Sequence, residues 1–389
     1  MKSMTPKTRL RTNKKILLLN YEFPPLGGGG GVASHTLAKG FIALGFDVDV
    51  VTSWHKGLKR FEIIDGISVY RVRVFGRNDL ETSTFISMAS FVITGFCKSF
   101  FLCLKSKYIF INTHFVVPTG PVGYLLALIF RMKNILSLHG GDIYDPTKKL
   151  SPHRNKVLRM VVRFLLNKAH RIVAQSTFTH RNAVKYYNPK KEIDIIPLPY
   201  EPFVFKSIKR INLNLSEDKI YLISVGRLVK AKGFEYFIEA LSLLPNVEGL
   251  IIGDGPEKKN LLNISKKLKV EDRVHFLGRR IGEKKFQYLD NADIYVSSSI
   301  QETFGIVLQE AMQVGLPIVV TENEGPASFI KDEINGLLVG LRNSQELAEK
   351  IRILIADSSL CKKMSERNKN DINDFDFRKI AKRYLNLLN

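Results

Sequence analysis

Short apolar runs alternate along the chain with stretches whose apolar residues recur at helical intervals. In the first half the runs predict buried strands over Lys14–Asn20, Val48–Thr52, Ile67–Val74, Tyr108–Asn112, Ile135–Leu138, Ile172–Gln175 and Ile193–Leu198. In the second half they predict strands over Ile220–Val225, Leu250–Ile252, Val274–Leu277 and Asp293–Ser298. Strands separated by helical stretches are typical of an α/β fold.

The chain is too long for one ordinary hydrophobic core, since at 389 residues it exceeds the usual size of a single domain. Pro197, Pro199 and Pro202 interrupt the pattern, and the strand–helix alternation then restarts. We therefore expect a boundary near residue 200, with domains over residues 14–200 and 201–370. Residues 1–13 carry four cations without an apolar run, which predicts a mobile basic tail and no signal peptide.

The segment Gln301–Pro317 places two carboxylates around the start of a predicted helix. From Phe304 the apolar residues recur at helical intervals, so Glu302 precedes the helix and Glu310 lies about two turns inside it. We expect the unpaired N–H groups at this helix start to belong to Phe304, Gly305 and Ile306. Such groups attract phosphate, because free donors and the helix dipole both favour negative charge. Two solvated surface glutamates are the alternative reading.

A second phosphate-binding pattern follows the first strand. The glycines Gly27 to Gly31 precede a helix predicted over Val32–Leu44, an arrangement that brings backbone close to phosphate. The spacing is not that of the dinucleotide fingerprint, and a flexible turn is the alternative. His139 ends a later strand, where ligands bind in open α/β sheets, and it could exchange a proton, donate hydrogen bonds or serve a structural role.

A pair of cations lies at the start of the second half. Arg227 ends a predicted strand and Lys232 comes just before the helix that begins at Phe234. An arginine and a lysine in one such loop form a clamp suited to a diphosphate.

The composition is that of a folded soluble protein, with 45% apolar and 25% charged residues, but the formal net charge is +22. This excess predicts a polyanionic neighbour: nucleic acid, an anionic membrane surface or phosphorylated ligands. The three cysteines form no metal or redox spacing and predict reduced thiols. Asp47 and Asp49 resemble a metal-binding pair, but at strand-like alternation they need only face solvent.

Two stretches favour a membrane. Ser83–Leu104 is almost long enough to span a bilayer and carries one charge; it could be a buried helix, a membrane-docking helix or a span. Lys148–Arg171 holds eight cations and no acid, interleaved with apolar residues. This pattern predicts an amphipathic basic helix, whose cations face either solvent or anionic lipid headgroups.

Several motifs together resemble the retaining glycosyltransferases of family 4. They are G-R-L with the lysine and glycine that follow (226–233), G-D-G-P (253–256), F-L-G (276–278) and E-(x)7-E from Glu302 to Glu310. In the first half, G-G-V at residues 30–32, H-G at 139–140 and A-H-R-I-V-A-Q-S at 169–176 are similar, with His170 in place of the usual aspartate. The resemblance implies the GT-B fold, two doubly wound Rossmann-like domains that face each other across a cleft. It also implies that residues 371–389 return to the N-terminal domain.

The resemblance assigns roles to single positions. Arg227 and Lys232 would hold the donor diphosphate and stabilise the leaving group, and Gly30 and Gly31 would approach the distal phosphate. Glu302 would bind the transferred sugar, with His139 beside its departing bond. The rest of the donor site would consist of Phe304, Gly305 and Ile306 near the sugar, Glu310 at the ribose and Gly278 beside the base. No metal or other cofactor is expected, and the acceptor would attack from the front face with retention.

The activity implied is transfer from a UDP- or GDP-linked sugar to a glycan or lipid-linked glycan, in the synthesis of surface polysaccharide or glycolipid. We expect a cytoplasmic protein, peripheral on the inner face of an anionic cell membrane, that does not bind nucleic acid. Two alternatives remain: a nucleotide-sugar epimerase of the same fold, which product analysis would separate, and a non-catalytic polyanion-binding protein, which the charge alone would explain.

Overall fold

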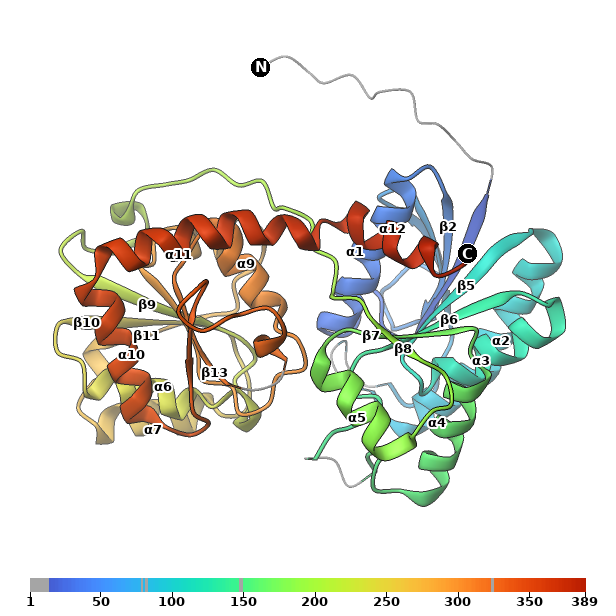
Figure 1. The fold of residues 1–389 in the computed structure, drawn as a ribbon, viewed down its shortest axis with the longest axis horizontal. Helices are drawn as coiled ribbons and strands as arrows, with labels where there is room; N and C mark the ends of the chain where they lie inside the picture. The colour runs from blue at the N-terminus through green and yellow to red at the C-terminus, as the bar shows by residue number, and fades with distance from the viewer. Residues whose placement is uncertain (1–13, 78–79, 81–82, 147–149, 323–324) are drawn as a thin grey trace, which may run out of the picture. The chain divides into compact units, whose positions relative to one another are not determined.

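The computed structural model describes residues 14–77, 80, 83–146, 150–322 and 325–389, so the predicted tail over residues 1–13 lies outside them. The chain divides into two compact units. Unit 1 contains Met1–Glu201 together with Phe375–Asn389, and unit 2 contains Pro202–Asp374. Each unit is a sheet covered by helices on both faces (Figure 1).

The sheet of unit 1 has eight strands in the order β3-β4-β2-β1-β5-β6-β7-β8. All pairs are parallel except β3 with β4. The strands are β1 (Lys15–Asn20), β2 (Asp47–Ser53), β3 (Phe61–Ile64), β4 (Ile67–Val72), β5 (Tyr108–His114), β6 (Lys133–Leu138), β7 (Arg171–Ala174) and β8 (Ile193–Ile195). Their apolar side chains alternate between two helical layers, which accounts for the nearly continuous apolar runs in the sequence.

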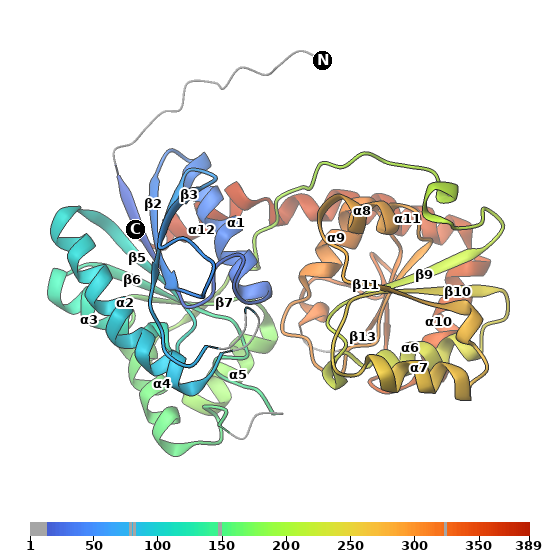
Figure 2. The same ribbon diagram turned by 180° about the vertical axis from the view of Figure 1, so that it is seen from behind.

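One face of this sheet is covered by α1 and α12, and the other by α2, α3, α4 and α5 (Figures 1 and 2). The helices are α1 (Gly29–Ala43), α2 (Phe85–Lys105), α3 (Thr119–Phe130), α4 (Lys156–Lys168), α5 (Thr177–Tyr187) and α12 (Phe377–Asn386). Within the described residues the basic helix is shorter than the predicted Lys148–Arg171, because Asn155 caps it through the backbone N–H of Leu158 and β7 begins at Arg171. Lys148 and Lys149 lie outside the described residues.

Unit 2 contains a six-stranded parallel sheet in the order β11-β10-β9-β12-β13-β14. Its strands are β9 (Ile220–Val225), β10 (Val247–Ile252), β11 (Val274–Gly278), β12 (Ile294–Ser297), β13 (Ile318–Thr321) and β14 (Leu337–Val339). Helices α6, α7 and α10 cover one face, and α8, α9 and α11 cover the other (Figures 1 and 2). These are α6 (Phe234–Ser242), α7 (Lys258–Lys267), α8 (Gly282–Asp290), α9 (Ile306–Val314), α10 (Ser344–Ala356) and α11 (Ser358–Asp371).

In each sheet the strand order reverses beside the first strand of the unit. The chain of unit 1 runs from β1 outward to β2 and β4, and then returns to add β5 on the other side of β1. Unit 2 repeats this with β9, β10 and β11 on one side and β12 on the other. At such a switch point the loops leave in opposite directions, and they open a crevice at the carboxyl ends of the two strands. The doubly wound fold thus fixes one candidate site edge in each unit.

Two features of unit 1 bear on the sequence-based expectations. Asp49 does not face solvent: it is buried, accepts a hydrogen bond from the hydroxyl of Tyr108 at 2.6 Å and lies 3.8 Å from the ammonium of Lys15. Helix α2 buries only one stripe of side chains, while its other face stays exposed, with Ile93 69% accessible. By length and composition α2 could span a bilayer, but this stripe packs against the sheet.

The last helix completes the core of unit 1. Ile380, Ala381 and Tyr384 of α12 belong to the same buried cluster as residues of α1 and the sheet. The backbones of the two helices approach closely at Gly40, where an added Cβ atom would lie 2.3 Å from the carbonyl oxygen of Phe377. Only glycine fits there without displacing α12.

We predict that Gly40→Ala lowers the thermal midpoint of the protein. Glycine to alanine inside a helix ordinarily stabilises it by about 1 kcal/mol, but here the overlap should reverse the sign, at a cost of about 1–3 kcal/mol. Gly141→Ala is the control, since an added Cβ meets no atom within 4 Å there. A midpoint for Gly40→Ala equal to or above that of the unmodified protein would contradict the close packing of α12.

Candidate active site

In unit 2, two loops meet at the carboxyl ends of β9 and β12. The carbonyl oxygen of Ala231 accepts hydrogen bonds from the backbone N–H groups of Ile300 and Gln301, at 2.9 and 3.1 Å. The hydroxyl of Ser298 donates to the carbonyl of Gly233 at 2.7 Å. Residues of these loops, widely separated in sequence, are therefore held in one fixed arrangement at the switch point.

The predicted cation and carboxylate of these loops pair with each other. The ammonium of Lys232 donates to Oε2 of Glu302, and their side chains are only 24% and 14% exposed. In such a partly desolvated place the attraction is stronger than between surface charges. An ammonium has three donors, so Lys232 can hold Glu302 and still offer hydrogen bonds to an anion.

The guanidinium of Arg227 differs from Lys232 in its surroundings. Arg227 is exposed, and no hydrogen bond or ion pair is found for its side chain among the described residues. An arginine of this kind is a planar, bidentate donor available to phosphate oxygens. The loop after β9 therefore carries Lys232, which is fixed by an ion pair, and Arg227, whose side chain has no partner among the described residues.

Helix α9 begins two residues later than the sequence indicated. Its first residue is Ile306, and Gly305 is the N-cap, with φ +95°. This left-handed conformation is costly for residues with a Cβ atom, which explains a glycine at this point. The expectation that the helix starts at Phe304 is therefore wrong, and the free N–H groups of its first turn start at Ile306. Phe304 is buried and packs on Phe329.

Glu310 lies inside α9 and is held from the neighbouring helix. The ammonium of Lys285 on α8 donates to its Oε1 at 2.5 Å. Its Oε2 is buried and has no hydrogen-bond partner within the described part of the chain. A buried carboxylate oxygen left without a donor is costly and is a ready acceptor for a ligand hydroxyl. Gly278, by contrast, ends β11 two strands away from β9, in open space.

Tyr295 of β12 is buried and is near enough to both carboxylates to be affected by their charge. Burial raises the pKa of its hydroxyl, and the negative charges of Glu302 and Glu310 raise it further. Tyr295 therefore stays neutral, so the negative charge in this region belongs to the two glutamates.

The candidate residues of unit 1 meet at its own switch point. Gly30 is part of the first turn of α1, which starts at Gly29 and not at Val32 as the sequence suggested. An added Cβ on Gly30 would lie 2.5 Å from Cζ of Phe115 and 3.2 Å from Nδ1 of His139. This close approach explains why the helix can begin with low-propensity glycines: larger residues would not fit against the ends of β5 and β6.

His139 is buried and both of its ring nitrogens are occupied. The amide nitrogen of Gln175 donates to Nδ1 at 2.5 Å, so the proton lies on Nε2, which donates to Nδ1 of His114 at 2.9 Å. His114 in turn donates from Nε2 to Asn112 at 2.8 Å. This buried chain fixes both tautomers and makes His139 a rigid, neutral group.

The turn around His139 has further support. Both oxygens of Asp142 accept backbone N–H groups, from His139 at 2.9 Å and Val116 at 2.7 Å. Burial raises the pKa of Asp142 to about 6, although these donors act in the opposite direction. Phe115 stacks on the His139 ring at 4.2 Å and has a positive φ of 66°. Strain of this kind persists where the surrounding structure enforces it.

The structure thus adds supporting residues that the sequence reasoning missed: His114, Gln175, Asp142, Lys285 and Tyr295. His114 ends β5 and Gln175 follows β7, the two strands on either side of β6, which precedes His139. The rule that ligands gather at this edge could have identified both, had the strand from Tyr108 been extended beyond Asn112. Lys285 carried no such signal, because its partner Glu310 lies on another helix.

Comparison with known proteins agrees with this arrangement. Residues 27–202 match the family described as "Glycosyltransferase Family 4", and residues 205–371 match "Glycosyl transferases group 1". An uncharacterized glycosyltransferase, MJ1607 of Methanocaldococcus jannaschii, is 28% identical over 96% of this chain and 97% of its own length. The lipopolysaccharide core biosynthesis glycosyltransferase LpsE of Rhizobium meliloti is 36% identical over 47% of this chain and 53% of its own length.

A third relative transfers N-acetylgalactosamine. It is the N-acetylgalactosamine-N,N'-diacetylbacillosaminyl-diphospho-undecaprenol 4-alpha-N-acetylgalactosaminyltransferase of Campylobacter jejuni, 28% identical over 76% of this chain and 82% of its own length.

Solved structures share the fold. The sucrose-phosphate synthase of Thermosynechococcus elongatus superposes with a TM-score of 0.82, at 22% identity over 96% of this chain and 98% of that one. The Anabaena protein Alr3699/HepE, in complex with UDP and glucose, superposes with a TM-score of 0.76, also at 22% identity and with the same coverage.

The two family matches fall on the two halves of the chain, and each half has the doubly wound sheet that the GT-B fold requires. The chain belongs to the GT-B glycosyltransferases of family 4.

Proposed function

We propose that this glycosyltransferase moves a sugar from a UDP- or GDP-linked donor to a lipid-linked glycan, with retention of anomeric configuration. The observation that carries the donor assignment is the set at the switch point of unit 2: Arg227, Lys232, Glu302, the start of α9 and Glu310. Two cations and a helix N-terminus suit a diphosphate, and Oε2 of Glu310, which has no donor within the described residues, suits a ribose hydroxyl.

Each residue of this set would have a distinct task. As the bond from the anomeric carbon to the diphosphate breaks, negative charge grows on the leaving oxygen, and Arg227 and Lys232 stabilise it. Glu302, fixed by Lys232, accepts hydrogen bonds from the transferred sugar. The acceptor hydroxyl forms the new bond on the same face and gives its proton to the departing phosphate. No metal ion is needed in this scheme.

Three of the proteins to which the chain is similar support this choice of substrates. The Anabaena structure contains UDP and glucose, the Campylobacter relative is named for a diphospho-undecaprenol acceptor, and the Rhizobium relative for lipopolysaccharide synthesis.

The acceptor assignment also rests on the outer surface of α2, α3 and α4, which lie side by side in unit 1 (Figures 1 and 2). On α4 the apolar side chains at i, i+3, i+4 and i+7 face solvent; they are Val157, Met160, Val161 and Phe164. Exposed apolar faces of this extent mark interaction sites. Between Ser83 and Lys191 the sequence has seventeen lysines and arginines and two acids. We propose that this face docks on the anionic cytoplasmic leaflet.

We predict that Lys232→Met and Arg227→Ala each weaken nucleoside diphosphate binding about tenfold or more, because each removes a charge-assisted donor. Isothermal titration with UDP and GDP measures this. Lys230→Ala, an exposed lysine of the same loop, is the matched control and should bind normally. Arg227→Ala should also keep its thermal midpoint, since no partner of its side chain is found among the described residues. If neither variant changed the affinity for UDP or GDP, the proposal that Arg227 and Lys232 hold the diphosphate would be refuted.

Glu302→Gln should separate binding from transfer. It removes the carboxylate that holds the sugar and frees Lys232, so UDP or GDP should bind at least as tightly, while the transfer rate falls by about 10²-fold or more. Product analysis by NMR reports the anomeric configuration. A variant that transfers normally would show that Glu302 has no part in the reaction.

We predict that the protein loses stability as the pH falls below about 6.5. Burial lowers the pKa of His114 to about 3, and burial with the charge of His114 lowers that of His139 far below its ordinary value. The unfolded chain takes up these protons near pH 6.5 and the folded chain does not. Each histidine therefore costs about 1.4 kcal/mol per pH unit below 6.5. Asp142, whose pKa is raised, offsets part of this loss between about pH 6 and 3.8.

Thermal midpoints at pH 7 and pH 5.5 test this. His114→Asn keeps an acceptor for His139 but removes one titrating group, so its midpoint should fall less on acidification. His55→Asn, at a partly exposed position outside this buried pair, should behave like the unmodified protein. Equal losses in all three proteins would mean that the buried histidine pair is not the cause.

We predict that the protein floats with vesicles of phosphatidylcholine and phosphatidylglycerol, but not with phosphatidylcholine alone, and that high salt releases it. Met160→Glu with Phe164→Glu should weaken binding by about tenfold or more, since each apolar side chain contributes about 1.5–3 kcal/mol when buried. Val204→Glu, on a still more exposed apolar residue of unit 2, is the control. Binding that is indifferent to lipid charge and salt would exclude this mode of docking.

A further inference from the structure

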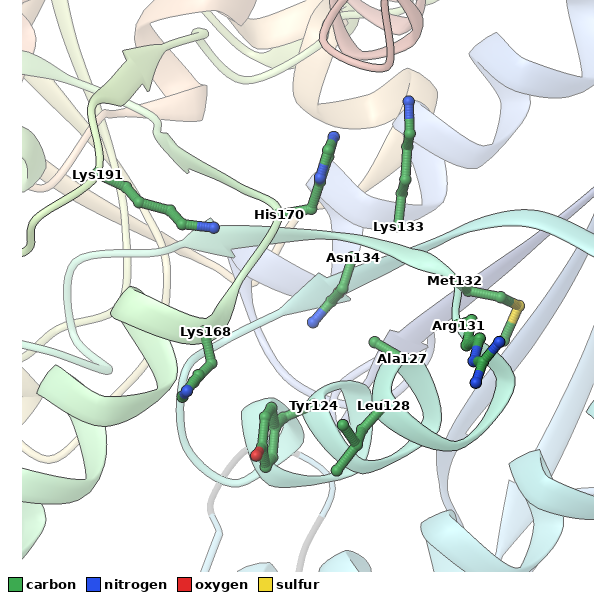
Figure 3. A pocket seen from close by; sticks show the side chains of 10 residues that line it. All are labelled: Tyr124, Ala127, Leu128, Arg131, Met132, Lys133, Asn134, Lys168, His170 and Lys191. Atoms are coloured by element: carbon green, nitrogen blue, oxygen red, sulfur yellow. The ribbon is translucent and has the colours of Figure 1, made fainter.

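A cavity of about 450 Å³ lies in unit 1, between the C-terminal ends of α3 and α4 and the first residues of β6 and β7 (Figure 3). It is at the amino end of β6, whereas His139 follows the carboxyl end of the same strand. Six residues of strand separate the two places by roughly 20 Å. The cavity is therefore distinct from the candidate site at the switch point, and it lies at the sheet edge that this fold does not ordinarily use for ligands.

The polar part of the cavity wall is cationic. Arg131, Lys168 and Lys191 contribute to it from three different segments, and no acidic residue is found in the lining within the described part of the chain. The ammonium of Lys191 donates to the carbonyl of Ala169, which fixes that side chain and leaves two further donors. Lys133 belongs to the lining but donates to the carbonyl of Leu388.

His170 lies at the same wall and responds to this charge. Burial lowers the pKa of its imidazole, and the cations Lys133, Lys191 and Arg171 lower it further. The family motif that the sequence resembles has an aspartate at this position. His170 of this chain adds no negative charge there. The cations of the lining are exposed, so water screens their mutual repulsion, and an anion in the cavity would reduce it further.

A buried amide completes the polar wall. Asn134 is 4% exposed, and its Oδ1 accepts a hydrogen bond from the hydroxyl of Thr113 at 2.7 Å. This fixes the amide so that its nitrogen points into the cavity, toward Tyr124 and Lys168 (Figure 3). No partner for this nitrogen is found among the described residues, and it is not one of the fully enclosed unpartnered atoms. It can therefore donate to water or to an acceptor on a ligand in the cavity.

The opposite wall is apolar and is formed by α3. Tyr124 and Leu128 line the cavity, and Leu128 is 61% exposed beside Leu125 and Ile129 on the same helix. The cavity thus opens next to the exposed apolar surface of α3. Its volume is larger than a bare phosphate requires and lies within the range of organic ligands.

We propose that this cavity is a binding site for a phosphate ester, with the phosphate held by Arg131, Lys168, Lys191 and the amide of Asn134, and the organic part against α3. The planar guanidinium of Arg131 can bind two phosphate oxygens, and the ammonium groups each bind one. A lipid headgroup is the source that the adjoining apolar surface favours. The site does not depend on the transferase reaction, so its test is a binding measurement.

The experiment compares three ligands: inorganic phosphate, glycerol 3-phosphate, and vesicles of phosphatidylcholine containing phosphatidic acid. We expect titration calorimetry to detect glycerol 3-phosphate, and co-sedimentation to detect the vesicles. Arg131→Ala with Lys168→Ala should lower both affinities about tenfold or more. His170→Asp should do the same, because it places a carboxylate at the wall of the cavity, and as an exposed position it should not disturb folding.

The matched control is Lys156→Ala with Arg163→Ala, which removes two exposed cations from α4 outside the cavity. If it weakens glycerol 3-phosphate binding in calorimetry as much as the Arg131/Lys168 pair, the attraction is general surface charge and the site is refuted. Its vesicle binding is not compared, because α4 belongs to the proposed docking face. Absence of binding to all three ligands also refutes it. Binding of the soluble phosphates with no preference for vesicles supports the site and identifies the ligand as a soluble phosphate ester. UDP binding in unit 2 should be normal in all of these variants, which separates this proposal from that of the transferase.

Discussion

The reversal of strand order in each sheet is the constraint on which the candidate sites depend. Parallel strands deliver all their carboxyl ends to one edge, and the loops diverge only where neighbouring connections run in opposite directions. In unit 2 this happens between β9 and β12, and in unit 1 between β1 and β5. Lys232 and Glu302 meet, although they lie far apart in sequence, because their loops follow the two strands that flank the reversal.

The chemistry of the two edges differs because their side chains differ. The edge in unit 2 combines fixed and open cations with two carboxylates, which suits a ligand that has both phosphates and hydroxyls. The edge in unit 1 is occupied by neutral groups that bind each other, with His139 held between Gln175 and His114. We regard the first as the place that binds charge and the second as a rigid polar surface. The edge in unit 1 is assembled from strand ends, whereas the edge in unit 2 also takes Glu310 from helix α9.

Much of this could be predicted from the sequence, because apolar runs and helical periodicity are local signals. The strands around the reversals, the fold class and the family motifs all belong to this group. What could not be predicted depends on contacts between distant segments. The starts of two helices differ from the predicted ones. α1 begins earlier because Gly30 allows a close approach, and α9 begins later because Gly305 forms a left-handed N-cap. The pairing of Lys285 with Glu310, the burial of Asp49 and the short strand β3 likewise arise from packing that no local pattern records.

The position of α12 has a consequence for biosynthesis. The chain leaves unit 1 after Glu201 and returns at Phe375, and the two crossing segments bind each other through Tyr200, whose N–H donates to Phe375 and whose carbonyl accepts from Phe377. Unit 2 is thus an insertion within unit 1. On the ribosome, α1 and its sheet must wait for their last covering helix while residues 202–374 are made, on the order of 10 to 30 s at ordinary rates. Unit 2 is complete before unit 1, so the half of the protein that is synthesised first is the last to finish folding.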